Sequence, residues 1–200
     1  MKLSYQGIQD KQGYAAAQVA LPQYDWAKMA EKTAEKPVWV HFGAGNIFRG
    51  FIAGLQQRLL NAGLAESGIV AAETFDYDII DKIYVPHDSM TLMVSLKADG
   101  STQKEVIASI AKGIKANCAD EAQWQQLTDV FTAPTLQMAS FTITEKGYAL
   151  SNMTGELMPV VLSDMEDGPK QPPHALAVVA PMRHEPHRAG AITSALVSTA

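Results

Sequence analysis

Two glycines and an arginine within a seven-residue segment, Gly43, Gly45 and Arg49, have the types and spacing that can hold the phosphates of a nucleotide. A residue without a side chain lets a diphosphate approach the main chain, and the first N–H groups of a helix lack intrahelical partners. A cation in the first helical turn is disfavoured by the helix dipole unless an anion offsets it. The candidate phosphate-binding turn therefore consists of Gly43, Ala44, Gly45, Asn46, Ile47, Phe48 and Arg49.

The turn departs from the usual G-x-G-x-x-G fingerprint, because Phe48 stands at the third glycine position. A bulky residue there predicts that the helix meets the preceding strand in an unusual way. Two other interpretations stay open. The glycines can form a purely structural turn, or Arg49 can be a solvated side chain paired with a nearby carboxylate.

The next apolar run, residues 68–73, ends in the acidic residue Glu73, and Asp76 and Asp78 follow it. In a dinucleotide site a carboxylate at the end of the second strand accepts hydrogen bonds from the adenosine ribose hydroxyls and repels a 2′-phosphate. Glu73 lies 28 residues beyond Gly45 (73 minus 45), which is longer than the usual spacing of about 20. We expect at least one of these three, with Glu73 and Asp76 as the first candidates, to bind the ribose and to favour NAD over NADP. The alternative for each is a carboxylate that only faces water.

A second polar cluster, residues 142–148, closes the apolar run 136–144. Ligands of open α/β sheets bind beyond the carboxyl ends of the strands, which places this cluster where a cofactor or substrate would be met. Thr144 offers a hydroxyl, and Glu145 offers a carboxylate that can carry a proton. The alternative is a polar loop in which Lys146 balances the charge of Glu145.

The elements that must position these residues alternate between strand and helix. We expect strands at 38–42, 68–73 and 136–144, helices at 24–36, 46–61 and 120–131, and a hairpin formed by 91–96 and 104–110. This alternation predicts an α/β fold, a Rossmann-like doubly wound and mostly parallel sheet with an inserted β-hairpin. Asn46 is expected to cap the helix after the turn, and one apolar stripe is expected to face the core, made of Phe48, Phe51, Ile52, Leu55 and Leu59.

Residues 1–36 are expected to form an N-terminal arm, and residues 37–200 a single dinucleotide-binding domain. Near the end of the chain we expect a hairpin over 151–161, a loop over 164–173, a helix from His174 to about Ala180 and a strand at 195–199. Pro181 and Pro186 interrupt any longer helix, because proline lacks the N–H and clashes with the preceding turn.

Composition excludes several classes of function. The 16 basic and 21 acidic residues give a net charge of −5 without a basic tract, which argues against nucleic-acid binding. No apolar run approaches the roughly 18 residues that would span a membrane, and the N-terminus lacks the apolar core of a signal peptide. The single cysteine indicates a reducing compartment, so we expect a cytoplasmic protein. No metal is expected, since no Cys or carboxylate pattern completes a site around His174, His184 and His187.

Three separated motifs together resemble a known family: HFGAGNIFRGF at 41–51, AAETFDYDIID at 71–81 and SFTITEKGY at 140–148. They are similar to the long-chain polyol and sugar-acid dehydrogenases, which include mannitol dehydrogenase, fructuronate reductase (mannonate oxidoreductase) and tagaturonate reductase. The resemblance covers about residues 1–180. The segments at 5–10 and 73–84 look closest to the fructuronate reductase branch.

The resemblance implies an NAD-dependent oxidoreductase that interconverts D-mannonate and D-fructuronate, with mannitol 2-dehydrogenase or tagaturonate reductase as alternatives. It implies that Thr144 and Glu145 line the site, and that the catalytic lysine lies beyond Ala200 in a helical substrate domain, so this chain alone would be inactive. A small-molecule polyol or sugar acid is the expected partner, and the oligomeric state is left open. An alternative of another class is a non-catalytic module that binds NAD(H).

Overall fold

The computed structural model describes residues 1–142, 149–167 and 193–196, the last as backbone only. Within these ranges, five parallel strands form the main sheet. Their spatial order is β6 (Ile110–Lys115), β3 (Ile69–Glu73), β2 (Trp39–Phe42), β7 (Met138–Phe141) and β8 (Thr193–Leu196). The first of these in the chain, β2, lies in the middle, and the strand order reverses between β2 and β7. The fold is therefore Rossmann-like, and this reversal is where such folds bind ligands.

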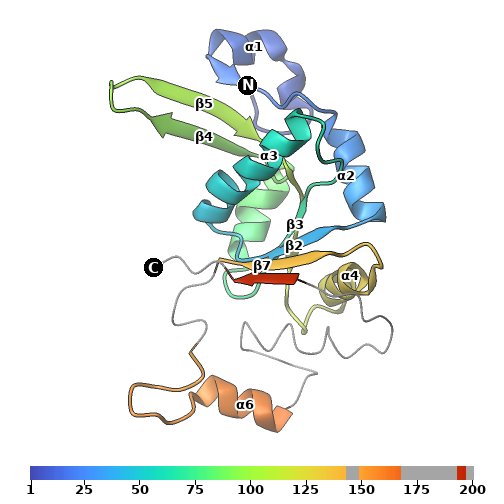
Figure 1. The fold of residues 1–200 in the computed structure, drawn as a ribbon, viewed down its shortest axis with the longest axis vertical. Helices are drawn as coiled ribbons and strands as arrows, with labels where there is room; N and C mark the ends of the chain where they lie inside the picture. Colours follow the sequence, from blue (N-terminus) through green and yellow to red (C-terminus); the bar gives the residue numbers. More distant parts are fainter. Residues whose placement is uncertain (143–148, 168–192, 197–200) are drawn as a thin grey trace.

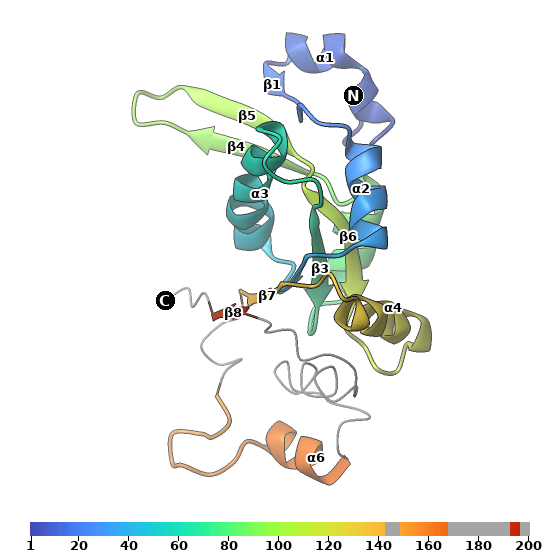
Figure 2. The same cartoon turned by 45° about the vertical axis from the view of Figure 1, so that its right-hand side comes forward.

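Helices cover both faces of this sheet, as Figure 2 shows. One face, which carries Val40 and Phe42, packs against α2 (Trp26–Glu35) and α4 (Glu121–Thr132). Asp25 and Asp120 cap these two helices, each by accepting a backbone N–H of the first turn. The other face packs against α3 (Ala53–Asn61) and the short helices described below. Both layers bury apolar side chains, so the strands are near-continuously buried, as parallel strands should be.

A second, smaller sheet projects from the main one (Figure 1). The predicted hairpin is present as β4 (Thr91–Leu96) and β5 (Thr102–Ile107), which pair antiparallel, and the short β1 (Val19–Ala20) pairs parallel with β5. The N-terminal segment, with a 3₁₀ turn at Gly7–Gln9 and α1 (Lys11–Ala16), packs on this hairpin. Its core is a cluster of its own, made of Ile8, Tyr14, Met90, Val106 and Ala108.

The predicted strand at 104–110 is in fact parts of two strands in different sheets. Strand β5 ends before Ala108 and β6 begins after Ser109, and hydrogen bonds to α3 hold the segment between them. The Gln57 amide donates to the Val106 carbonyl at 2.8 Å and accepts the Ala108 N–H at 2.7 Å, and the Ser109 hydroxyl donates to the Ala53 carbonyl. Sequence reasoning missed β6 because the apolar pattern continues across the break.

The prediction of an apolar, core-facing stripe on the helix after the glycine turn is wrong for three of its five residues. Phe48 and Ile52 are buried, but Phe51 is 65% exposed, and Leu55 and Leu59 also face solvent. A π-helical turn at Phe48–Ile52 precedes α3 and shifts the register of everything that follows. The core-facing side of α3 is instead partly polar, because glutamines there hydrogen-bond the backbone of neighbouring segments.

Two further helical segments were not predicted. A π-helix at Ile80–Tyr84 and a 3₁₀ turn at Val85–His87 follow β3. The π-helix packs on β6, where Gly113 allows the close approach: a Cβ there would lie 2.8 Å from the Tyr84 ring. The turn expected near residue 155 is present, with a bridge between Ser151 and Leu157.

The prediction that this hairpin extends to residue 161 is wrong. From residue 159 the chain forms α6 (Pro159–Asp167), where a hairpin arm and a loop were expected. Proline at the first helical position favours this start, because its missing N–H has no intrahelical acceptor there. The expected helix at 174–180 and its prolines lie outside the described residues.

Candidate functional site

The candidate turn lies at the carboxyl end of β2, between β3 and β7. The Gly43 N–H donates to the Ala72 carbonyl of β3, and the Thr142 N–H, just after β7, donates to the Phe42 carbonyl, both at 2.9 Å. Gly43 has φ of +101°, and a Cβ on it would lie 2.5 Å from the Thr142 carbonyl oxygen. Only glycine fits this position, because both the backbone angle and the space exclude a side chain.

Side chains from the neighbouring segments hold the next two peptide groups. The Gly43 carbonyl accepts from the Thr142 hydroxyl at 3.3 Å, and the Ala44 N–H of the same peptide donates to Glu73 Oε2 at 2.8 Å. The Ala44 carbonyl then accepts from the Tyr84 hydroxyl at 3.0 Å. The turn is therefore fixed from both sides by groups far away in the sequence.

This arrangement determines where the following backbone donor points. In a trans peptide the N–H and C=O point in opposite directions, and the Ala44 carbonyl points at the buried Tyr84. The Gly45 N–H is therefore directed away from the core. Gly45 is exposed, and a Cβ on it would meet nothing within 4 Å. The start of the helix, at Gly45, Asn46 and Ile47, therefore offers first-turn N–H groups beside open space. An anionic ligand needs both.

Arg49 lies in the first helical turn, with its N–H donating to the Gly45 carbonyl at 3.1 Å. Asn46 does not cap this helix as expected: it lies within the helix, and its side-chain oxygen accepts from Arg49 Nη2. The ion pairs found within the described ranges do not include Arg49, and its buried Nε has no hydrogen-bond partner among the described residues. A cation with a free donor beside helical N–H groups fits a phosphate.

Phe48, at the position of the missing third glycine, is fully buried and stacks on His41 of β2, with ring centroids 4.0 Å apart. His41 Nδ1 is 2.7 Å from Ser140 Oγ, and Nε2 is 2.9 Å from Thr142 Oγ1. The Trp39 indole N–H also reaches Ser140 Oγ, at 2.6 Å. Burial lowers the pKa of His41 to about 3, so its imidazole is neutral at physiological pH.

Sequence reasoning missed this polar group beneath the turn. A histidine inside the apolar run 38–42 was its only signal in the sequence.

The predicted acidic residues occupy different environments. Glu73 is buried, and its Oε1 accepts the N–H groups of Thr74, Phe75 and Asp76 while Oε2 accepts that of Ala44. Its carboxylate is therefore occupied by backbone donors, and its contact with a ribose stays a prediction. Asp76 is exposed near the same strand end. Thr144 and Glu145 lie outside the described residues.

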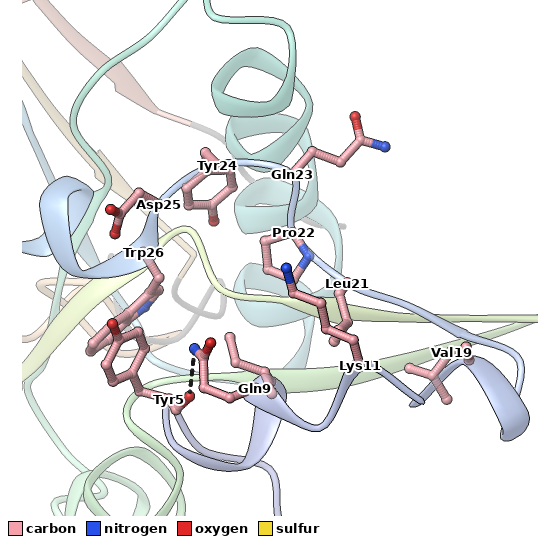
Figure 3. Close-up of a pocket in the computed structure, with 12 residues that line it drawn as sticks. Tyr5, Gln9, Lys11, Val19, Leu21, Pro22, Gln23, Tyr24, Asp25 and Trp26 are labelled. Atoms are coloured by element: carbon pink, nitrogen blue, oxygen red, sulfur yellow. Dashed lines mark hydrogen bonds between the residues drawn. The ribbon is translucent and has the colours of Figure 1, made fainter. Parts of the chain in front are cut away.

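A separate cavity of about 600 Å³ lies between the N-terminal segment and the start of α2 (Figure 3). None of its lining residues belongs to the Gly43 turn. Tyr5 and Trp26 stack within it at a centroid distance of 5.0 Å, and the Gln9 amide donates to the Tyr5 carbonyl at 3.2 Å. Burial raises the pKa of Tyr24 nearby. We assign the cavity no chemistry.

Comparison with curated proteins identifies two relatives. The D-mannonate oxidoreductase of Thermotoga maritima is 40% identical over 198 residues, which is 99% of this chain and 36% of the relative. An uncharacterised oxidoreductase of Escherichia coli K12 is 27% identical over 166 residues, covering 82% of this chain and 33% of the relative. The chain thus spans about a third of the length of these relatives. A scan against protein-family models found no match.

Solved structures share the fold. A D-sorbitol dehydrogenase in substrate-free form matches with a TM-score of 0.74 and 23% identity, over 92% of this chain and 37% of that one. The Pseudomonas fluorescens mannitol 2-dehydrogenase, solved as a ternary complex with NAD and D-mannitol, matches with a TM-score of 0.74 and 24% identity, over 99% of this chain and 38% of that one. No helix in the described part of the chain is long and apolar enough to cross a membrane. The chain is thus similar to a D-mannonate oxidoreductase over nearly its whole length, and it shares its fold with mannitol and sorbitol dehydrogenases.

Proposed function

We propose that this chain binds NAD(H) at the turn from Gly43 to Arg49. The observation that carries the proposal is the geometry at Gly45. The Ala44 carbonyl of its peptide points at Tyr84, which directs the Gly45 N–H away from the core, and a Cβ on Gly45 would meet nothing within 4 Å. Arg49, with an unpartnered Nε in the described part of the chain, supplies the charge for a diphosphate. Asp76, exposed just beyond the end of β3, is the acidic residue proposed for the ribose hydroxyls, and Thr144 and Glu145 are proposed to line the nicotinamide side.

The full-length protein is proposed to catalyse the reversible oxidation of D-mannonate to D-fructuronate with NAD, in the cytoplasm. The 40% identity to a D-mannonate oxidoreductase over nearly the whole chain supports this substrate, and the neighbour solved with NAD supports the cofactor. Oxidation of an alcohol by NAD transfers a hydride to the nicotinamide and releases the hydroxyl proton to a base. That base is proposed to be a lysine beyond residue 200.

Cofactor binding is tested by titrating NADH into the chain while protein fluorescence is recorded. Gly45→Val places a branched side chain in the open space above the turn, so we expect the Kd to rise at least about tenfold, equivalent to about 1.4 kcal/mol. Ala98→Val, at the exposed turn of the β4–β5 hairpin, adds bulk away from the site and should leave the Kd unchanged. Equal affinities for all three proteins would disprove the phosphate role of the turn.

Substrate choice is tested separately with the full-length gene product. NADH oxidation is followed by absorbance with D-fructuronate, D-tagaturonate and D-fructose in parallel, and we expect D-fructuronate to give the highest kcat/KM. Preferred turnover of D-fructose or D-tagaturonate would move the assignment to another branch of the family. No turnover of any of the three would remove it.

A further inference from the structure

The polar group under the Gly43 turn has a definite direction of hydrogen bonding. The Trp39 indole N–H can only donate, so Ser140 Oγ accepts it at 2.6 Å and keeps its own proton to give. His41 Nδ1 lies 2.7 Å from that hydroxyl and, unlike the indole nitrogen, can accept its proton. If Nδ1 accepts the Ser140 proton, the hydrogen of the neutral imidazole must be on Nε2.

The same direction continues to the turn. A protonated His41 Nε2 donates to Thr142 Oγ1 at 2.9 Å, and the Thr142 proton is then free to reach the Gly43 carbonyl at 3.3 Å. In the opposite tautomer, Nε2 would take the Thr142 proton and the Gly43 carbonyl would lose this donor. Only the Nε2-protonated form supplies a proton to every link between Trp39 and Gly43.

A charged imidazole breaks one link of this chain of hydrogen bonds. Nδ1 would then carry a hydrogen directed at Ser140 Oγ, so His41 would no longer accept the Ser140 proton. The ring has no exposed surface and stacks face to face on Phe48, at an interplanar angle of 6°. Burial accordingly holds the pKa of His41 far below its ordinary value of 6.5.

We propose that His41 is a positioning residue for the cofactor, which acts in its Nε2-protonated tautomer through Thr142 to orient the Gly43–Ala44 peptide. The inference rests on the proposed binding of NAD(H) at this turn. The Thr142 hydroxyl fixes the carbonyl side of that peptide, and Glu73 fixes its N–H side. A rotation of this peptide would turn the next donor, the Gly45 N–H, away from the phosphate position. His41 itself touches no ligand.

Two substitutions of Thr142 test the proposal in the full-length protein. Thr142→Val keeps the shape but removes the hydroxyl, and Thr142→Ser restores it. We expect NADH to bind about tenfold more weakly to the valine variant and within about threefold of wild type to the serine variant. The control is Thr135→Val, because the Thr135 hydroxyl also donates to a backbone carbonyl, that of Pro37 at 2.9 Å, but before β2 begins. It should leave NADH binding unchanged.

The tautomer is measured directly by ¹H–¹⁵N correlation spectra of histidine-labelled protein, which keeps the test valid if a variant folds poorly. We expect His41 to show a protonated Nε2 and an unprotonated Nδ1 between pH 5 and 8, and the Nε2 proton signal to shift in Thr142→Val. A protonated Nδ1 would overturn the proposal. If wild type binds NADH and Thr142→Val binds it equally well, the positioning role fails alone. If wild type does not bind NADH, the proposed function fails as well.

Discussion

Substitution of Gly43 by alanine should lower the stability of the folded chain far more than the same substitution at Gly45. A non-glycine residue at φ of +101° stores roughly 1–3 kcal/mol of strain. The new Cβ would also lie 2.5 Å from the Thr142 carbonyl oxygen, a backbone atom that can move only if β7 moves. We therefore expect Gly43→Ala to lower the free energy of unfolding by about 3 kcal/mol or more.

The matched variant is Gly45→Ala, where a Cβ meets nothing within 4 Å and φ lies outside the positive region. Its free energy of unfolding should change by less than about 1 kcal/mol, and could rise because alanine restricts the unfolded chain.

Thermal unfolding followed by circular dichroism measures both variants. For a chain of this size about 1 kcal/mol corresponds to roughly 2–4 °C, so Gly43→Ala should melt about 6–12 °C below wild type. Gly45→Ala should melt within about 3 °C of it. If the two variants melt at the same temperature, the account of the turn as a strained backbone held against β7 is wrong.

Further predictions concern the groups around the turn. His41 has a folded pKa of about 3 and an ordinary pKa of 6.5, so below pH 6.5 the unfolded chain binds a proton that the folded chain does not. The contribution of neutral His41 to the free energy of unfolding is therefore fully present above that pH and is lost as the pH drops toward 3, by about 2 kcal/mol at pH 5. Urea titrations at pH 5 and 7 should show this loss in wild type and not in His41→Gln. Tyr84→Phe removes the donor to the Ala44 carbonyl and should cost about 1–3 kcal/mol in urea unfolding at pH 7, and no loss would mean that this buried carbonyl finds another partner. Glu73→Gln places an amide among four backbone donors and should lower the free energy of unfolding by about 1.5–3 kcal/mol. A change in NADH affinity at unchanged stability would instead indicate that Glu73 binds the ribose.

The parts of the fold that the sequence predicts are those with local signals. The β2 strand, the glycine turn and the following helix appear where expected, because an apolar run, a Gly-x-Gly and a helical repeat are contiguous in the chain. The π-helical turn at Phe48–Ile52 has no such signal, and it reversed the exposure of Phe51, Leu55 and Leu59. The residues of β6 were missed because the break before it depends on Gln57, about fifty residues away.

The candidate site was predicted only as far as its backbone. Glycine spacing located the turn, but its three side-chain supports, Glu73, Tyr84 and Thr142, reach it across 29, 40 and 99 residues of sequence. The sequence pointed to Glu73 as a ribose ligand and not as a support of the turn, and nothing in the sequence indicates a role for Tyr84. Hydrogen bonds of this range depend on which strands become neighbours, and that is a property of the folded sheet.

The same supports set the order in which the turn can mature during folding. Contacts between distant residues form late, because closing a long loop costs entropy before the contact can stabilise it. The turn can acquire its Glu73 and Tyr84 contacts as soon as β3 and the segment after it dock on β2. Its last support, the Thr142 hydroxyl, comes with β7. In a nascent polypeptide that has emerged from the ribosome only as far as residue 130, the glycine turn would therefore lack one of its three side-chain supports. Cofactor binding would begin only after β7 has joined the sheet.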